Sequence, residues 1–242
     1  MNSTRSYSIA AGVLFILGTT AALAAAALLP TLTGSDYLRG VAGHPGQMAA
    51  AALVYLVSAG TSVGIAIALY PVLKRVGAAL ALGSVVFRAI EAVMYTVVVL
   101  SLLSIWTLSQ QVATAPAADL APIHVLAGSL LSLRDHANLA AVFAYGTGAL
   151  MYYALLYRSR LVPRWLSMWG VAGVLLILTA CVLALYRNDA VTGYTLLILP
   201  IAVQEIALAL WLLIRGFNPS ASSASSIKTA TFRDTTPAAE LS

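Results

Sequence analysis

An arginine and two glutamates lie within the most apolar parts of this sequence. Arg88 and Glu91 are three residues apart in FRAIEAVMY, and Glu205 follows Gln204 in another apolar run. Ionised side chains in such surroundings can bind a cation, relay a proton or form a buried ion pair. One arginine neutralises only one of the two glutamates. Either one carboxyl group is therefore protonated, or a cation joins the three side chains.

The composition around these charges is that of a membrane protein. Hydrophobic residues make up 61% of the 242 residues and charged residues 9%, and the mean hydropathy is +0.92. A helix needs about 20 mostly apolar residues to cross a hydrocarbon core of roughly 30 Å. We expect an all-α, polytopic membrane protein with six transmembrane helices, at residues 9–29, 48–69, 79–106, 137–156, 165–185 and 192–214.

Basic residues in the connections predict the orientation of these helices. With both termini in the cytoplasm, nine of the 13 Lys and Arg residues lie on the inner side and three on the outer side, and Arg88 lies within a span. Short cytoplasmic loops are enriched in Lys and Arg. We therefore expect a multi-pass protein of the cytoplasmic (inner) membrane with a cytoplasmic N-terminus and C-terminus. The lipid bilayer is its expected partner, and no nucleic-acid partner is expected.

The chain divides into a membrane bundle and a polar end. Residues 1–217 are expected to form the bundle, and residues 218–242, rich in Ser, Thr, Ala and Pro, a disordered cytoplasmic tail. The first span could be a secretory signal, but its 21 residues exceed the ~7–15 of a signal core, so a retained span is favoured. Helical spacing between Leu120 and Arg134 predicts a short helix lying on the outer surface.

Helical spacing also predicts which side chains face the interior of the bundle. Arg88, Glu91 and Tyr95 lie on one stripe with Ser84, and a rise of 1.5 Å per residue puts the charges near mid-membrane. Each unpaired charge would cost about 2.5–3.5 kcal/mol there, so the charges are expected to face one another. The predicted ligand-binding or ion-pair residues are Arg88, Glu91, Glu205, Gln204, Tyr95, Ser84, Tyr145, Ser58 and Ser62.

Histidines gather on the predicted outer side. His44, His124 and His136, with Asp119 and Asp135, could form a zinc site. Their spacing matches no metal motif, and no GxSxG, P-loop or GxGxxG sequence occurs. We therefore assign no metal, no cofactor and no catalytic residue, and a non-enzymatic role is favoured over an enzymatic one.

Two glycines could let helices approach closely. Gly60 and Gly64 follow the small-xxx-small pattern in the second span. This pattern is typical of packing within a bundle and also of the seam of a homodimer.

Three segments together resemble a known family. FRAIEA, AYGTGALMYYALLYRSRLVPRWLSMWG and LPIAVQEIALALWLLIRG are similar to the bacterial membrane family called domain of unknown function 4386, and the resemblance covers the chain except its tail. It implies about six membrane helices and no assigned activity. The residues that carry it are Arg88, Glu91, Pro163, Arg164, Trp165, Leu166 and Glu205.

These observations leave three hypotheses of different classes. The first is a polar midplane pocket that binds or conducts a small cation, a proton or an amphiphile. The second is a structural or regulatory membrane protein whose buried charges are only interhelical salt bridges. The third is an intramembrane metal-dependent hydrolase that uses the outer histidines.

Overall fold

The computed structural model describes residues 3–34, 36–112, 114–116 and 120–218, and its regular structure there is entirely helical. Every α-helix except the short α2 is long and apolar enough to span a membrane, which gives six such helices among the described residues. The predicted all-α class is thereby confirmed. Apart from Asn218, the predicted tail lies outside the described residues. The elements are α1 (Ser3–Leu28), α2 (Tyr37–Gly43), α3 (Pro45–Leu73), α4 (Ala78–Val112), α5 (Leu120–Ser159), α6 (Arg164–Arg187), the 3₁₀ helix η2 (Val191–Gly193) and α7 (Thr195–Ile214).

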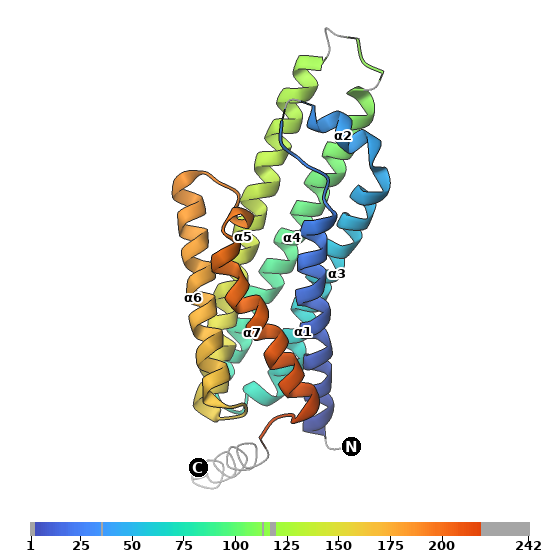
Figure 1. The fold of residues 1–242 in the computed structure, drawn as a ribbon. Helices are drawn as coiled ribbons and strands as arrows, with labels where there is room; N and C mark the ends of the chain where they lie inside the picture. Colours follow the sequence, from blue (N-terminus) through green and yellow to red (C-terminus); the bar gives the residue numbers. More distant parts are fainter. Residues whose placement is uncertain (1–2, 35, 113, 117–119, 219–242) are drawn as a thin grey trace, which may run out of the picture.

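The six long helices form a closed ring (Figure 1). Each packs against the long helix that follows it in the chain, and α7 packs against α1 to complete the circle. Every long helix therefore turns one face to a shared interior and another face outward. Polar side chains from distant parts of the sequence can meet inside this ring.

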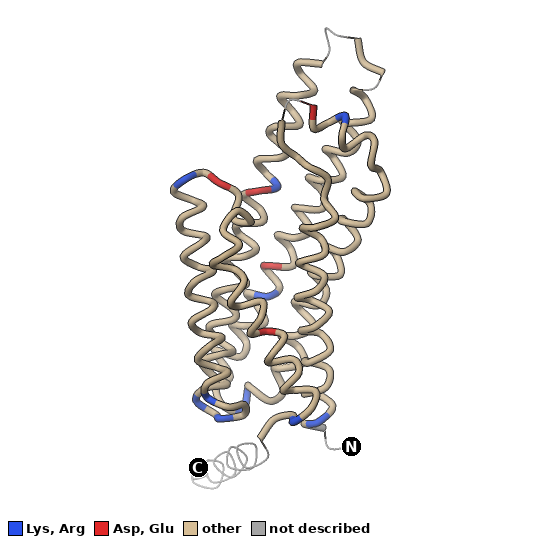
Figure 2. Tube along the Cα trace, in the orientation of Figure 1, with Lys and Arg blue, Asp and Glu red and all other residues tan. Residues whose placement is uncertain are grey.

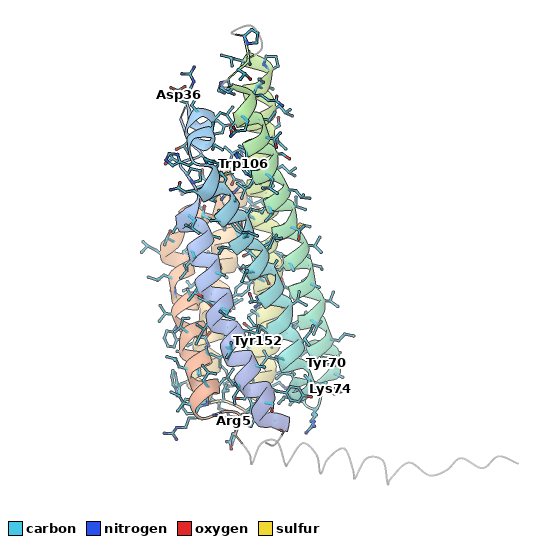
Figure 3. All side chains as sticks on the ribbon, turned by 90° about the vertical axis from the view of Figure 1, so that its right-hand side faces the viewer. Arg5, Asp36, Tyr70, Lys74, Trp106 and Tyr152 are labelled. Atoms are coloured by element: carbon cyan, nitrogen blue, oxygen red, sulfur yellow. The ribbon has the colours of Figure 1, made fainter. Side chains whose placement is uncertain are left out.

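The start of α1 closes the ring by capping the end of α7. The two terminal nitrogens of Arg5 donate hydrogen bonds to the carbonyls of Leu212 (3.2 Å) and Leu213 (2.6 Å), and Ser8 Oγ donates to Leu212 (2.5 Å). The last carbonyls of a helix have no partner within the helix, and a positive charge near them is favourable. Both ends of the described chain therefore lie together (Figure 1). In Figure 3, Arg5 and Lys74 mark this end of the ring and Asp36 marks the opposite end.

Basic residues gather at the end that holds both chain termini (Figure 2). This asymmetry between the two ends matches the one predicted from the sequence. Of the described residues, this end holds Arg5, Lys74, Arg75, Arg158, Arg160, Arg164 and Arg215, and the opposite end holds Arg39, Arg134 and Arg187.

The predicted short surface helix between Leu120 and Arg134 is wrong. These residues are the first part of α5, which has 40 residues and would reach about 60 Å, roughly twice the thickness of a hydrocarbon core. One side of this segment packs against the far part of α4 and against α2, whereas Val125, Leu126 and Leu133 on its other side are exposed. The fully packed members of this small cluster are Leu38, Ile105, Val112 and Ala127.

Close packing fills the end of the ring near the termini. The rings of Tyr152 and Tyr153 are buried there, with centroids 4.4 Å apart. Gly170 of α6 is required by this packing, because a Cβ atom at that position would lie 2.3 Å from the Tyr153 ring. Gly64 also packs within the bundle, because a Cβ atom at that position would lie 3.2 Å from Leu14 of α1. A Cβ atom at Gly60 would have nothing within 4 Å.

These glycines give a matched pair of substitutions. Gly170→Ala should lower the free energy of unfolding by about 1–3 kcal/mol, because the added methyl overpacks the Tyr153 ring. Gly60→Ala should be neutral or stabilising by up to about 1 kcal/mol, because it adds a better helix former where space is open. Thermal unfolding of the purified variants in detergent checks this. Equal melting temperatures for the two variants would contradict the packing described here.

Candidate functional site

A cavity of about 270 Å³ lies inside the ring, and all six long helices contribute to its walls. Its volume is close to the lower end of the range of ligand pockets, which is about 300–1,000 Å³. Most of its wall is apolar, and its polar groups come chiefly from α3, α4, α5 and α7. Of the nine predicted site residues, seven line it: Arg88, Glu91, Glu205, Tyr95, Tyr145, Ser58 and Ser62.

Helix α4 brings its charges to the cavity by simple helical geometry. Arg88 and Glu91 are 3% and 4% exposed, and Tyr95 is buried one turn beyond Glu91. The opposite face carries Val86 and Val93, which are about half exposed on the outside of the ring. The polar face of α4 therefore points inward and its apolar face outward, as a membrane requires.

The Arg88–Glu91 ion pair lies within one turn of α4. Arg88 Nη1 is 2.9 Å from Glu91 Oε2, and Ser62 Oγ of α3 donates to the same oxygen at 2.5 Å. Charge-assisted bonds of this kind are stronger than those between neutral groups. Among the described residues, no donor bonds to the other oxygen of Glu91.

Glu205 does not pair with Arg88, which corrects the expected arrangement of one arginine between two glutamates. Its carboxylate instead accepts hydrogen bonds from Thr19 of α1 (2.8 Å) and from the Tyr145 hydroxyl of α5 (2.9 Å). The ion pairs found among the described residues do not include Glu205. The reason is the ring, since α4 and α7 are not neighbours in it and face each other across the cavity.

Tyr145 connects the two charged groups that the ring keeps apart. The Arg88 guanidinium carbon lies 4.9 Å from the centroid of its ring, within the range of a cation–π contact. The hydroxyl of the same side chain donates to Glu205. One tyrosine thus contacts the cation through its ring face and the anion through its hydroxyl.

Two predicted residues, Gln204 and Ser84, are not among the cavity-lining residues that the structure describes. Gln204 is fully buried, donates to the Leu166 carbonyl of α6 (3.0 Å) and accepts from the Tyr153 hydroxyl. Successive residues of a helix are about 100° apart around its axis. Here Glu205 faces the cavity, and Gln204 faces Leu166 of α6 and Tyr153 of α5. Ser84 donates to the Ala81 carbonyl of its own helix (2.8 Å).

Thr19 and Asn138 are buried polar residues that line the cavity and are not among the nine predicted site residues. Threonine is common in membrane helices, where it bonds to its own backbone, as the neighbouring exposed Thr20 does with Ile16. A signal was nevertheless present, because Thr19 continues the spacing of Ala11 and Phe15, both fully buried. A polar residue on a buried stripe indicates a bond across the ring.

The cavity is closed toward the termini and reaches toward the opposite end. The packed core around Tyr152 fills the ring on the side of the termini. Helices α1 and α7 contact each other near Gly12 and diverge toward the other end (Figure 1). Leu23 of α1 and Thr195 and Ile198 of α7 line the cavity between the diverging helices.

The outer histidines are dispersed in the structure. The Nδ1 atoms of His44 and His136 lie 2.8 Å and 2.7 Å from carbonyls of their own segments, Gly40 and Ser132. Within the described residues, no three His, Cys, Asp or Glu side chains come together in a way that could hold a metal ion. Asp119 lies outside the described residues.

Comparison with known proteins identifies a family and no activity. No curated protein and no solved structure matches this chain. A family model matches residues 10–216, which cover nearly all of the ring of helices and every cavity residue described above. The resemblance predicted from the sequence is thereby confirmed, and the chain belongs to the family described as Domain of unknown function (DUF4386).

Proposed function

We propose that this protein binds a small amphiphile with a cationic group in the cavity inside its ring of helices. The observation that carries this proposal is Glu205, which is 8% exposed, lines the cavity and has no ion-pair partner among the described residues. Arg88 is already matched by Glu91. A positive group beside Glu205 would balance the charge of the site.

The walls of the cavity favour an organic ligand over a bare ion. They are mostly apolar, and Leu23 and Ile198 line the part between the diverging α1 and α7. An amphiphile could reach Glu205 from the lipid side through this part, with its apolar body against the walls. The tyrosine rings of Tyr55, Tyr95 and Tyr145 would add favourable contacts with a cation.

The closed end of the cavity favours binding over conduction. Large buried side chains such as Tyr152 and Leu69 fill the ring between the cavity and the end with the termini. A ligand that entered beside Glu205 would stop at this core.

A purely structural role for the charges is the alternative. It requires that they join helices, but the Arg88–Glu91 pair lies within α4 and does not connect α4 to α7. Neutral donors, Thr19 and Tyr145, make the bonds between helices at Glu205. A structural role therefore explains why Glu205 accepts hydrogen bonds from two other helices, but it does not explain the negative charge, because a neutral side-chain amide could also accept such bonds.

Hexylammonium and hexanol give a direct test of the proposed ligand class. They have the same apolar chain, and only the amine offers a charge to Glu205. The melting temperature of the detergent-purified protein should rise with hexylammonium concentration at pH 7 to a plateau, as ligand linkage requires, and should not rise with hexanol. Equal shifts with both compounds would contradict a cation site.

Two amide substitutions separate the roles of the glutamates. Glu91→Gln removes the ion partner of a buried arginine and should cost about 3–5 kcal/mol of stability. Glu205→Gln keeps an oxygen that can accept a hydrogen bond and should cost about 1–2 kcal/mol or less.

The ligand response should distinguish these variants further. Glu205→Gln should abolish the hexylammonium shift, and the wild-type shift should shrink as the pH is lowered, because protonation removes the negative charge that binds the amine. Melting curves from pH 5 to 8 check both statements. A full hexylammonium response in the Glu205→Gln variant would contradict the proposed site.

We further propose that the protein lies in the cytoplasmic membrane with both termini in the cytoplasm. The end with both termini holds most of the basic residues, so it should face the cytoplasm. Reporter fusions after Arg75, after Arg160 and at the C-terminus should be cytoplasmic, and fusions after Gly43 and Asn188 should be external. The reverse pattern would contradict this orientation.

A further inference from the structure

A second cavity, of about 480 Å³, lies at the end of the ring that holds both termini. It is bounded by the α5–α6 connection, the start of α6 and the segment after α7. Three arginines line it: Arg160, Arg164 and Arg215. We propose that this cavity binds the phosphate group of an anionic lipid.

The guanidinium groups of these arginines are available to an anion. The ion pairs found among the described residues include none of the three. The Arg164 guanidinium lies 5.3 Å from the centroid of the Tyr157 ring, and that of Arg215 lies 5.8 Å from the Trp211 ring. Cation–π contacts of this kind position the side chain without using its N–H donors, which remain free for phosphate oxygens.

The start of α6 adds backbone donors to the same place. Pro163 precedes the helix and gives no side-chain hydrogen bond to its first amides. The amides of Leu166 and Ser167 donate to the Pro163 carbonyl, which leaves those of Arg164 and Trp165 as the donors at this end. Together with the helix dipole, such amides favour an anion. Pro163 and Arg164 both line the cavity, so these donors stand beside the arginines.

The walls of this cavity are held together by the backbone. Gly216 follows α7 with a φ of +74°, a conformation that favours glycine, and turns the chain away from the helix. The Asn218 amide then donates to the Leu161 carbonyl at 2.9 Å, which ties the end of α7 to the α5–α6 connection. Arg215 is thereby held on one wall of the cavity and Arg160 on the other.

The position of the cavity, at the height where tryptophans gather, favours a lipid as the carrier of the phosphate. Trp211 lines it, and Trp165, 57% exposed, stacks on Trp169 in the first turns of α6. Tryptophan is enriched at the height of lipid headgroups. The partly exposed Trp211 ring gives the cavity an apolar side along which an acyl chain can lie.

Other basic residues at this end of the ring do not line the cavity, and one of them supplies a matched control. Arg5 is engaged with the carbonyls of α7. Arg158 is exposed on the last turn of α5 and is not among the residues that line the cavity. R158Q therefore removes the same charge from the same end of the protein without altering the proposed site.

Lipid titration of the full chain tests this proposal. Delipidated protein in a neutral detergent would be titrated with phosphatidylglycerol, phosphatidylcholine or inorganic phosphate, and native mass spectrometry would count the bound molecules. Wild type and R158Q should bind one phosphatidylglycerol tightly. R160Q should bind it about fivefold more weakly and R160Q/R215Q about 30-fold more weakly, at about 1 kcal/mol for each arginine. Phosphatidylcholine and inorganic phosphate should not compete with it.

Several outcomes would overturn the proposal. Equal weakening by R158Q and R160Q would indicate a diffuse surface charge instead of a site. Equal binding of phosphatidylcholine would remove the role of anionic charge, and displacement by inorganic phosphate at millimolar concentration would make free phosphate the ligand. Arg160 is exposed and forms no hydrogen bond through its side chain to the described residues, so folding of R160Q, checked by its melting temperature without lipid, should be unchanged.

Discussion

The low dielectric of the hydrocarbon core governs the centre of this protein. An ionised group cannot be solvated by lipid, so each charge inside the ring needs a partner from another side chain or from a ligand. Arg88 and Glu91 meet this need within one turn of α4. Glu205 receives only neutral donors, and two hydrogen bonds do not cancel its charge. The cavity beside it is where the missing positive charge would enter.

The ring of helices explains why this imbalance persists. A compact bundle would allow α7 to approach α4 and bring Glu205 to Arg88. In the ring, the two helices lie across the cavity from each other, and Tyr145 contacts both charged groups from a third helix. The same arrangement leaves the interior open at mid-height, while close packing around Gly170 and Tyr153 fills the end near the termini. The cavity and the most closely packed part of the core thus occupy different halves of the molecule.

The sequence predicts most of the fold because membrane spans require long apolar runs and because helical spacing fixes which side chains share a face. These two rules predicted six long apolar helices and a shared face for Arg88, Glu91 and Tyr95, and the structure contains both. They do not determine how helices are ordered around a ring, so the pairing of Glu205 with Thr19 was missed and its pairing with Arg88 was wrongly expected. Helical spacing also cannot distinguish a short surface helix from the start of α5, since both present the same apolar stripe.

The central claim is that a cationic group balances the charge of Glu205 inside the cavity. A crystal structure of the protein with bound 6-bromohexylammonium tests it most directly, because the anomalous signal of bromine reports the position and direction of the ligand. We expect density for the ligand inside the ring, with its nitrogen beside the Glu205 carboxylate and its bromine toward Leu23 and Ile198. Bromine found only on the outer surface of the helices, with the cavity beside Glu205 free of ligand at saturating concentration, would contradict it.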